Sequence, residues 1–460
     1  MAGRTQSSKY DVVILGAGAA GLAAARQLSR EGLNIVVLEA RNRIGGRILT
    51  HVDPTLTVPI ELGAEFVHGA PRETLELCDE NGLGLYDVLD SHFMKGSRGK
   101  LKASDHNWEQ VQRVFARLKP ERAKDRSIAE FLKTQAGRES LTTLGLVKSY
   151  AEGFHAGDVD ALSEVGLAHA EQATPESSGE LDHSGIFRIF DGYHRIPEIL
   201  YAGIRSPDSV VKLNRVAEKI LWSSDRSSGG VEITAHHRLT SEREIYSART
   251  LVCTLPVGVL ASSAGPEFSP VPKNLERALT SVRMGSAARI TLKFQKRFWE
   301  GRGPGPIGMI HGKPSAMFPT WWTSQPIRAP LITGWAGGPK ALEVYSLPVA
   351  KRIEVALESL GELFDLSVRQ LSRDLQSAHH HDWQNDIFSR GAYSWIAVDG
   401  FRDAESFQRP VSKTLYFAGE ATNNTAARGT VDGAIASGVR AARQILRDHW
   451  RERDRSLQNR

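Results

Sequence analysis

Cysteine is scarce in this sequence: Cys78 and Cys253 are the only two among 460 residues. Two cysteines so far apart do not support a disulfide framework, and their scarcity suits a reducing compartment. Apolar runs of about 18 residues, the length needed to cross a membrane, are also missing. The first nine residues (MAGRTQSSK) are polar and lack the apolar core of a secretory signal. We therefore expect a cytoplasmic protein without a membrane span.

A large excess of either charge is absent as well. Lysine and arginine number 58, and aspartate and glutamate number 53, which gives a net charge of +5. The stretch from Arg440 to Arg460 carries +4 of this charge, because it holds seven arginines and three acids. This stretch is typical of a solvated helix end, and no basic stripe with interleaved aromatic residues occurs elsewhere. Nucleic acid is therefore not an expected partner.

A glycine-rich turn between an apolar strand and a helix stands near the start of the chain. Residues 10–15 (YDVVIL) form a short apolar run, which is typical of a strand buried on both faces of a parallel sheet. This run leads directly into residues 16–21 (GAGAAG), and a helix is expected over 22–30. A second apolar strand over 34–38 ends at Glu39. The order of these parts predicts a Rossmann-type dinucleotide-binding unit.

Each part of this unit has a physical role. Gly16 permits a tight turn, Gly18 lets the backbone approach a pyrophosphate, and Gly21 allows close contact between helix and strand. The helix start offers free N–H groups and the positive end of its dipole to phosphates. Glu39 is placed to accept hydrogen bonds from ribose hydroxyls, and its negative charge disfavours a 2′-phosphate. A plain flexible loop would not explain the acid at this position.

The segments that follow narrow the choice of dinucleotide. Residues 39–47 (EARNRIGGR) hold arginines, which bind phosphate through forked donors, and a glycine pair that permits close approach of the backbone. Together with residues 61–66 (ELGAEF), 253–256 (CTLP) and 415–420 (LYFAGE), this segment resembles the flavin amine oxidase family. That family includes monoamine and polyamine oxidases, lysine-specific demethylases and L-amino-acid oxidases. The resemblance runs from about residue 10 to 445 and is weakest at roughly 90–200.

The resemblance implies a non-covalently bound FAD. Ala392 stands where monoamine oxidases carry a flavin-linked cysteine, so covalent attachment is not expected there. Near the C-terminus, Glu420 is expected at the ribitol or pyrophosphate, and the helix start at Thr430 and Val431 at the flavin O2/N1 edge. A simple helix cap is the alternative interpretation of residues 429–434. The residues expected to contact FAD are Gly16, Gly18, Ala20, Gly21, Glu39, Ala40, Arg41, Gly46, Arg47, Leu62, Gly63, Ala64, Glu65, Val216, Trp383, Gly419, Glu420, Thr430 and Val431.

The two flavin-binding segments lie at opposite ends of the chain, so the FAD domain must be discontinuous. The expected fold class is α/β (α+β overall), with a Rossmann-type FAD-binding domain and a mixed sheet-plus-helices substrate domain. We assign residues 1–89, 206–275 and 401–460 to the first domain, and 90–205 and 276–400 to the second, with helices at about 105–200. Strands are expected over 210–220, 230–235, 250–255, 290–294, 331–335 and 414–418, and helices over 128–135 and 143–152.

The resemblance further implies oxidation of amines. A hydride passes from the carbon next to the nitrogen to flavin N5, the imine hydrolyses to an aldehyde or ketone, and O₂ is reduced to H₂O₂. Tyr393 matches one wall of the family's aromatic cage, although a core aromatic in a hairpin is the alternative. The opposite wall falls at Thr430, and Trp395 is a further candidate. His68 matches a position near the substrate nitrogen in polyamine oxidases, although an ordinary hydrogen-bonded histidine fits nearly as well.

Arg289 departs from the family pattern. It stands where the family usually has a lysine that holds a water against N5, and it replaces that lysine by a broader, permanently protonated fork. Slow reaction with O₂, or another electron acceptor, is therefore an open alternative. L-amino-acid oxidase is the second functional hypothesis, with Arg289 as the candidate for binding the substrate carboxylate. A desaturase of the carotenoid or protoporphyrinogen type is the third.

The remaining expectations concern partners. The histidines at 379–381 invite a metal interpretation, but only two of them share a strand face, so no metal is expected. A small-molecule amine and O₂ are the expected partners. The oligomeric state stays open, with a homodimer as one option.

Overall fold

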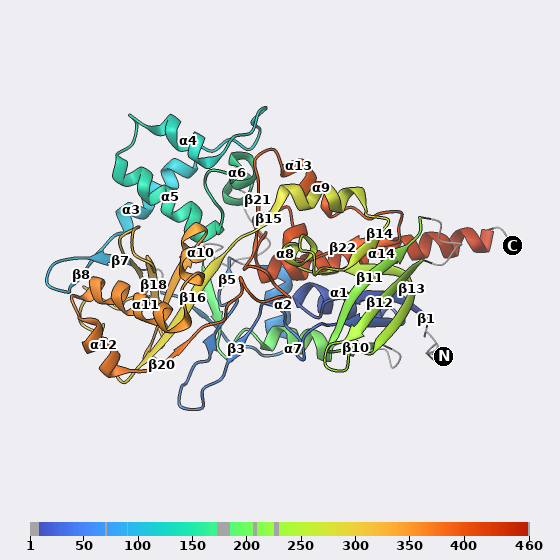
Figure 1. The fold of residues 1–460 in the computed structure, drawn as a ribbon, viewed down its shortest axis with the longest axis horizontal. Helices are drawn as coiled ribbons and strands as arrows, with labels where there is room; N and C mark the ends of the chain where they lie inside the picture. Colours follow the sequence, from blue (N-terminus) through green and yellow to red (C-terminus); the bar gives the residue numbers. More distant parts are fainter. Residues whose placement is uncertain are drawn as a thin grey trace.

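The computed structural model describes residues 9–69, 71–89, 91–172, 185–205, 209–224 and 230–458 (Figure 1). The molecule is elongated: one sheet lies near the two chain termini, a second lies towards the opposite end, and a group of helices lies above the second sheet in this view. The fold is therefore of the mixed α/β class that the sequence predicts.

The first sheet holds eight strands among the described residues, in the order β10-β2-β1-β13-β12-β11-β14, with β22 also paired to β13. These strands are β1 (Lys9–Leu15), β2 (Ile35–Leu38), β10 (Val210–Lys212), β11 (Arg215–Trp222), β12 (Val231–His237), β13 (Arg243–Cys253), β14 (Glu267–Ser269) and β22 (Leu415–Phe417). Strand β1 lies parallel to both β2 and β13. Its residues 12–15 are at most 1% exposed, which confirms the prediction of a strand covered on both faces.

Two strand predictions in this sheet need correction. The single strand expected over 210–220 is wrong, because β10 pairs with β2 whereas β11 pairs with β12 and β14. The chain changes direction between β10 and β11 at Asn214, whose φ of 58° lies in the left-handed region that asparagine tolerates. The strand expected over 250–255 is only the end of β13, which begins at Arg243.

Helices from both ends of the chain pack together on this sheet. Helix α1 (Ala19–Arg30) contacts the final helix α14 (Val431–Gln458), and both contribute to one buried apolar cluster. The two backbones lie very close, because a Cβ at Gly438 would lie 2.2 Å from the carbonyl oxygen of Ala20. Helix α7 (Arg195–Ala202) also packs against α1. Thus the last part of the segment 90–205 packs with the first sheet, and the domain boundaries stay a prediction.

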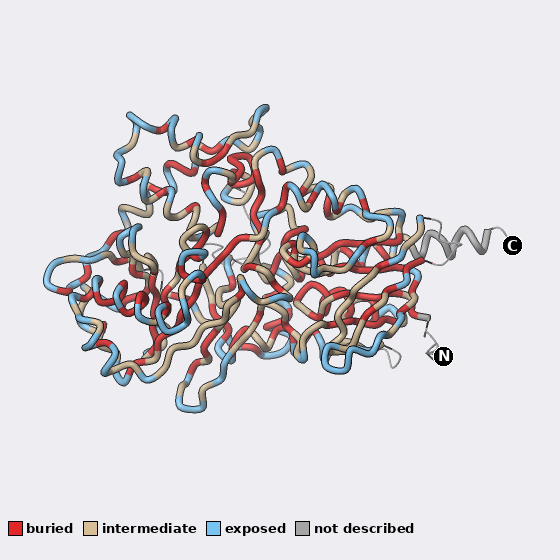
Figure 2. Tube along the Cα trace, viewed as in Figure 1, coloured by how far each residue is buried: buried red, intermediate tan, exposed pale blue. Residues whose placement is uncertain are grey.

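The second sheet has the order β20-β16-β19-β18-β17-β7-β8. Its strands are β7 (His92–Lys95), β8 (Leu101–Ala103), β16 (Ala287–Phe294), β17 (Met309–His311), β18 (Thr320–Thr323), β19 (Leu331–Gly337) and β20 (Leu375–His379). Strands β16 and β19 confirm the predictions over 290–294 and 331–335. Both are almost wholly buried (Figure 2), and helices α10 (Pro339–Tyr345), α11 (Val349–Phe364) and α12 (Val368–Asp374) lie beside the sheet.

The helical group consists of α3 (Asp105–Phe115), α4 (Ile128–Gln135), α5 (Leu141–His155) and α6 (Glu164–Gln172). Helix α4 has the predicted bounds, and it starts at a capping box between Ser127 and Glu130. Helix α5 is longer than the predicted 143–152. At its N-terminus, the side chain of Ser140 accepts a hydrogen bond from the amide of Thr143. At its C-terminus, Ala156 caps the helix with a φ of 53°.

Short elements join the larger parts. They are β3 (Thr50–His51), β4 (Ile60–Glu61), β5 (Val67–His68), α2 (Arg72–Glu80), β6 (Leu85–Asp87), β9 (Ile186–Ile189), α8 (Val257–Leu260), α9 (Lys273–Ser281), β15 (Val282–Met284), β21 (Ser394–Ile396), α13 (Phe401–Phe407) and the 3₁₀ turn η2 (Glu420–Thr422). Strand β9 pairs with both β5 and β6.

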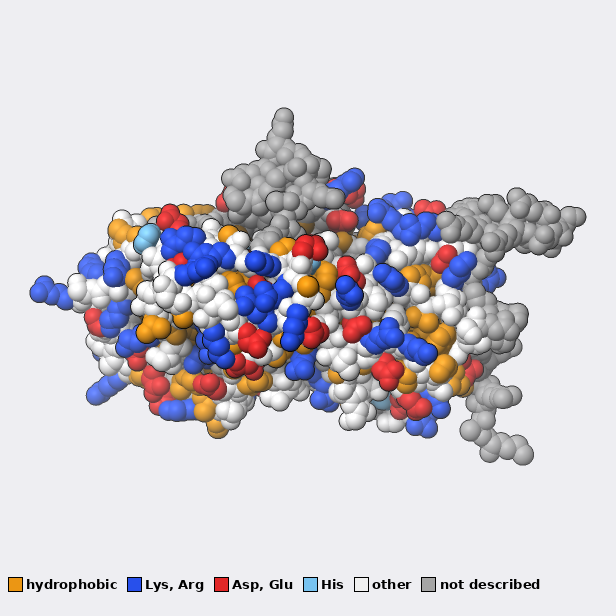
Figure 3. All heavy atoms as spheres, turned by 90° about the horizontal axis from the view of Figure 1, so that it is seen from above, with side chains coloured by type: hydrophobic (Ala, Val, Ile, Leu, Met, Phe, Trp, Pro, Cys, Tyr) orange, Lys and Arg blue, Asp and Glu red, His pale blue; other side chains and the backbone are white. Residues whose placement is uncertain are grey.

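The distribution of surface charge and the state of the two cysteines agree with what the composition indicates. On the face shown in Figure 3, basic and acidic side chains are intermingled. Cys78 and Cys253 are both buried and free. Among the helices that the structure describes, none has the length and apolar character needed to cross a membrane.

Candidate active site

A cavity of about 1280 Å³ is lined by residues of the two sheets and of the helical group. Its volume exceeds the roughly 300–1,000 Å³ typical of a site for one small ligand. All the residues expected from the sequence at the cofactor and substrate sites line this cavity, with the exception of Gly21. It is therefore large enough for a cofactor and a substrate together.

The glycine turn after β1 forms one end of the cavity wall. Gly21 lies behind the turn, where a Cβ would come within 1.9 Å of the carbonyl oxygen of Gly16. Gly16 has a φ of 99°, a conformation that glycine adopts without strain. A Cβ at Gly18 would meet no atom within 4 Å, so the backbone there borders open space. No side chain caps α1, which leaves its first amides available to an anion in the cavity.

The acid at the end of β2 is buried beside this turn. The Glu39 carboxylate accepts hydrogen bonds from the amides of Ala17 and Arg41, both at 2.8 Å. Burial raises the pKa of Glu39 above its ordinary value, although these two bonds and the nearby arginines oppose the shift. The acid thus lies where the carboxyl ends of β1 and β2 meet, at the edge of a parallel sheet where ligands commonly bind.

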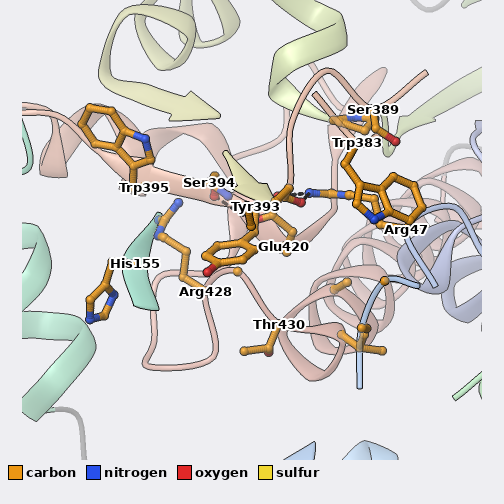
Figure 4. A pocket seen from close by; sticks show the side chains of 18 of the residues that line it. Arg47, His155, Trp383, Ser389, Tyr393, Ser394, Trp395, Glu420, Arg428 and Thr430 are labelled. Carbon is orange, nitrogen blue, oxygen red and sulfur yellow. Dashed lines mark hydrogen bonds and ion pairs between the residues drawn. The ribbon is translucent and has the colours of Figure 1, made fainter. Parts of the chain in front are cut away.

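Two arginines connect this first motif to distant parts of the chain. Arg41 donates two hydrogen bonds to Asp386, at 2.8 and 2.9 Å, and a third to Ser389. Its fork, expected at a phosphate, is thus engaged with the 381–393 segment. Arg47 donates to Glu420 at 2.8 Å and to the carbonyl oxygen of Ala392 at 2.6 Å. The first and last sequence motifs therefore meet through an ion pair (Figure 4).

The C-terminal motif closes the opposite wall. Glu420 is 5% exposed, and its second oxygen accepts hydrogen bonds from the amide and hydroxyl of Ser394. Thr430 caps α14, because its hydroxyl accepts a hydrogen bond from the amide of Gly433 at 3.0 Å. The helix-cap interpretation therefore describes the Thr430 hydroxyl, while Thr430 and Val431 both border the cavity. The positive end of a long helix thus faces this space.

Aromatic side chains dominate the part of the cavity beyond these motifs. Tyr393 donates a hydrogen bond to the carbonyl oxygen of Phe154 at 2.6 Å, and burial raises its pKa, so the hydroxyl stays protonated. Trp383 donates to the carbonyl oxygen of Leu62. Residues missed from the sequence are Tyr150, Phe154, Trp322 and Trp335, which also line this part, as does Trp395.

One signal in the sequence could have found Trp322. Trp321 and Trp322 are adjacent in strand β18, so they must point to opposite faces of the sheet. Trp321 is fully buried in the core of the second sheet, and Trp322 borders the cavity. The helical residues Tyr150 and Phe154 carried no comparable signal.

A buried charge cluster surrounds Arg289. This side chain pairs with Glu65 at 2.6 Å and donates to the carbonyl oxygen of Gly63 at 3.1 Å. Arg188 donates to the other oxygen of Glu65 at 2.7 Å, and the Trp322 indole donates to the same carboxylate. Burial alone would raise the pKa of Glu65, but Arg289 and Arg188 outweigh it and hold that pKa below its ordinary value. Arg289 is thus fixed by a carboxylate, and nothing in the sequence pointed to Arg188.

His68 lies on the cavity wall without a hydrogen-bonding partner for its ring among the residues that the structure describes. The ring centroids of Phe66 and Phe154 each lie 6.0 Å from the centroid of the His68 ring. This side chain is accessible from the cavity but enclosed by protein, and the enclosure lowers its pKa to about 4. The imidazole is therefore neutral at pH 7, and no described residue supports the interpretation as an ordinary hydrogen-bonded histidine.

The comparison with known families decides the identity. A model described as flavin containing amine oxidoreductase matches residues 19–446. The chain belongs to the flavin-containing amine oxidoreductase family.

The relatives of this chain carry names of several activities. Lysine-specific histone demethylase 2 of Homo sapiens is 26% identical over 461 residues, which cover 94% of this chain and 53% of the demethylase. Polyamine oxidase 4 of Oryza sativa subsp. japonica is 27% identical, over 95% of this chain and 89% of that protein. The chain spans 30%, 53% and 52% of the length of three histone demethylases that it matches.

Solved structures share the fold. Putrescine oxidase bound to putrescine superposes with a TM-score of 0.77 at 19% identity, covering 96% of this chain and 100% of that chain. An identity this low supports the common fold and does not specify a substrate.

The histidines at 379–381 include two that make contacts within the protein. His379 stacks on His51 at 4.8 Å, and His381 contacts Asp386 at 2.8 Å. No group of three or more metal-binding side chains occurs among the described residues. These histidines instead support the 381–393 segment that carries Trp383 and Tyr393.

Proposed function

We propose that this protein is an amine oxidase that binds FAD non-covalently and oxidises primary or secondary amines to imines, which hydrolyse to aldehydes or ketones, with O₂ as the acceptor. The observation that carries the proposal is one continuous cavity. A dinucleotide-type glycine turn, the Arg47–Glu420 pair and an aromatic chamber around Tyr393 all open onto it. The two buried free cysteines suit the cytoplasmic location expected from the sequence.

The residues present fit FAD. Gly18 and the uncapped start of α1 suit the pyrophosphate, and Glu39 suits the adenosine ribose. The start of α14 at Val431 suits the electron-rich edge of the flavin ring. Ala392 borders the cavity without a nucleophile, and neither cysteine is among the lining residues, which supports non-covalent attachment.

The chain's own residues prepare the amine for oxidation. Bound FAD supplies an acceptor for the two electrons and the hydrogen of the carbon next to nitrogen, and returns the electrons to O₂ to give H₂O₂. The aromatic walls at Phe154, Trp322 and Tyr393 exclude water and favour the neutral form of the amine. His68 stays neutral at pH 7, so its ring can accept a hydrogen bond from the substrate nitrogen and orient it.

Arg289 has an electrostatic role in this proposal. Glu65 and Arg188 hold it in place, so one net positive charge remains in the cluster on the cavity wall. Because its carboxylate partner is already Glu65, Arg289 is a poor candidate for binding a substrate carboxylate. The position of Arg289 therefore argues against the L-amino-acid oxidase hypothesis in which Arg289 binds the substrate carboxylate.

The test begins with the purified yellow protein. Anaerobic addition of benzylamine-type amines, polyamines, amino acids and N-methyl compounds should bleach the flavin absorbance with at least one class. Acid precipitation should release free FAD into the supernatant. Tyr393→Leu should slow bleaching, whereas Tyr201→Leu, on the exposed face of α7, should not. If no compound bleaches the protein, the amine oxidase proposal fails.

A further inference from the structure

Arg428 borders the cavity in the turn between η2 and α14. Its guanidinium donates to the carbonyl oxygen of Ala421 at 2.5 Å and to the side-chain oxygen of Asn424 at 2.7 Å. Both acceptors are neutral, and no carboxylate of the described residues lies within ion-pair distance of Arg428. The cation is therefore held in position by neutral groups, without a direct ion pair among the described residues.

The other enclosed arginines of the cavity wall differ in this respect. Arg41, Arg47, Arg215 and Arg289 each form an ion pair with a carboxylate. Among the described residues, the Arg238 side chain hydrogen-bonds to Asn214, and this arginine is exposed to solvent. Within the described part of the wall, Arg428 is thus the enclosed arginine that lacks an acid. Arg428 therefore differs from the arginines whose ion pairs stabilise the protein.

An enclosed cation without a counter-ion is costly, because water is replaced by groups that solvate the charge less well. Burial lowers the pKa of Arg428 to about 10, against the opposing effect of Glu420, so the group is still charged at pH 7. A ligand carboxylate in the cavity would compensate this charge. It could do so through the fork geometry in which guanidinium and carboxylate match.

Arg428 faces the substrate part of the cavity. In the view of Figure 4 its side chain extends beside the ring of Tyr393 towards Trp395 and His155. All four residues line the same cavity. His155 is itself paired with Glu171 at 2.7 Å, so that carboxylate is already engaged. Among the described residues, no free carboxylate is therefore left to pair with Arg428, and a ligand in the aromatic chamber could supply one.

We propose that Arg428 forms an anion subsite in the substrate chamber, and that the substrate is an amine which also carries a carboxylate. This inference rests on the proposed amine oxidase function and specifies its substrate class. The same cation repels a second ammonium group, so diamines and polyamines are disfavoured relative to amines with a carboxylate at the same position. Loop support at Ala421 and Asn424 positions the guanidinium for this task.

Binding of simple ligands to the FAD-loaded protein tests the subsite without turnover. Benzoate and benzyl alcohol have similar size and differ in charge. We expect benzoate to bind roughly tenfold more tightly or better, measured by calorimetry and by the shift of the flavin spectrum. Arg428→Met should remove this preference, and Arg428→Lys should keep part of it. Arg443→Met, on the exposed side of α14, removes the same charge outside the cavity and should leave the preference unchanged.

The outcomes are separable. Equal binding of benzoate and benzyl alcohol to the unchanged protein overturns the subsite. A loss of both ligands in Arg428→Met, with benzoate preference also absent in Arg428→Lys, assigns Arg428 to loop support alone and overturns it as well. If carboxylates bind as expected but no amine bleaches the flavin, the subsite stands and the amine oxidase proposal fails. If amines without carboxylates bleach fastest, the substrate class is refuted while the oxidase remains.

Discussion

Glu61 and Glu65 lie four residues apart and are both buried, yet their surroundings predict opposite responses to neutralisation. Glu61 accepts hydrogen bonds from the hydroxyl of Thr50 and the amide of Tyr193, and its carboxylate has no ion-pair partner among the described residues. Glu65 lies between Arg188 and Arg289. We expect Glu61→Gln to stabilise the protein above neutral pH and Glu65→Gln to destabilise it.

The magnitudes follow from the two environments. Burial raises the pKa of Glu61 from 4.5 to about 7. At about 1.4 kcal/mol per pKa unit, ionised Glu61 costs up to about 3 kcal/mol of folding free energy. The folded pKa is the higher one, so the stability is fully present below the unfolded pKa and is lost as pH rises through 7. Glu61→Gln removes this loss. Glu65→Gln leaves two buried arginines without their carboxylate, which costs about 3 to 5 kcal/mol.

Urea denaturation of both variants and the unchanged protein, each saturated with FAD, measures these effects. At about pH 5 Glu61→Gln should be only slightly more stable than the unchanged protein, and at about pH 8 the difference should be clearly larger. Glu65→Gln should be less stable at both values, because the pKa of Glu65 is lowered and its carboxylate is ionised throughout. Parallel pH profiles for the unchanged protein and Glu61→Gln would refute the reasoning, as would similar stability changes in the two variants.

Three further predictions concern the site. Gly21→Ala should yield protein without flavin, because its Cβ would lie 1.9 Å from the carbonyl oxygen of Gly16. Gly18→Ala should fold and bind FAD more weakly. Equal flavin content of the two purified variants would contradict this prediction. Asp386→Asn should lower the free energy of unfolding by about 1–3 kcal/mol, because it weakens the paired hydrogen bonds from Arg41, and unfolding in urea measures the loss. His68→Gln should leave the pH profile of kcat/KM unchanged between about pH 6 and 8, because the pKa of His68 is about 4; a lost inflection in that range would argue against a neutral His68.

Local patterns in the sequence were sufficient to place some individual elements. Strand β1 and helix α4 have almost the predicted bounds, because apolar run length and a capping box are local signals. The break between β10 and β11 was missed, because both halves are equally strand-like and their separation depends on which neighbour each one pairs with. Asn214 was the only local hint of that break.

Within the site, the sequence indicated the individual residues better than their partners. Arg41 and Arg289 were expected to face ligands, and the structure gives each a carboxylate, Asp386 and Glu65. These pairs join residues hundreds of positions apart, so no spacing rule connects them. Arg188 carried no signal at all, because it lies in the weakest part of the family resemblance. The sequence therefore indicated which residues line the site, but not which distant residues pair with them.

The ion pair between Arg47 and Glu420 spans 373 residues of the chain. A ribosome that adds about 5–20 residues per second needs roughly 20 to 75 s to make the stretch between them. During that time the glycine turn already exists, but the wall that completes its pocket has not been made. If the proposed FAD site is correct, the complete flavin pocket forms only after translation has nearly ended. A chain that is interrupted before its last helix is therefore expected to bind no flavin, even if its first half has folded.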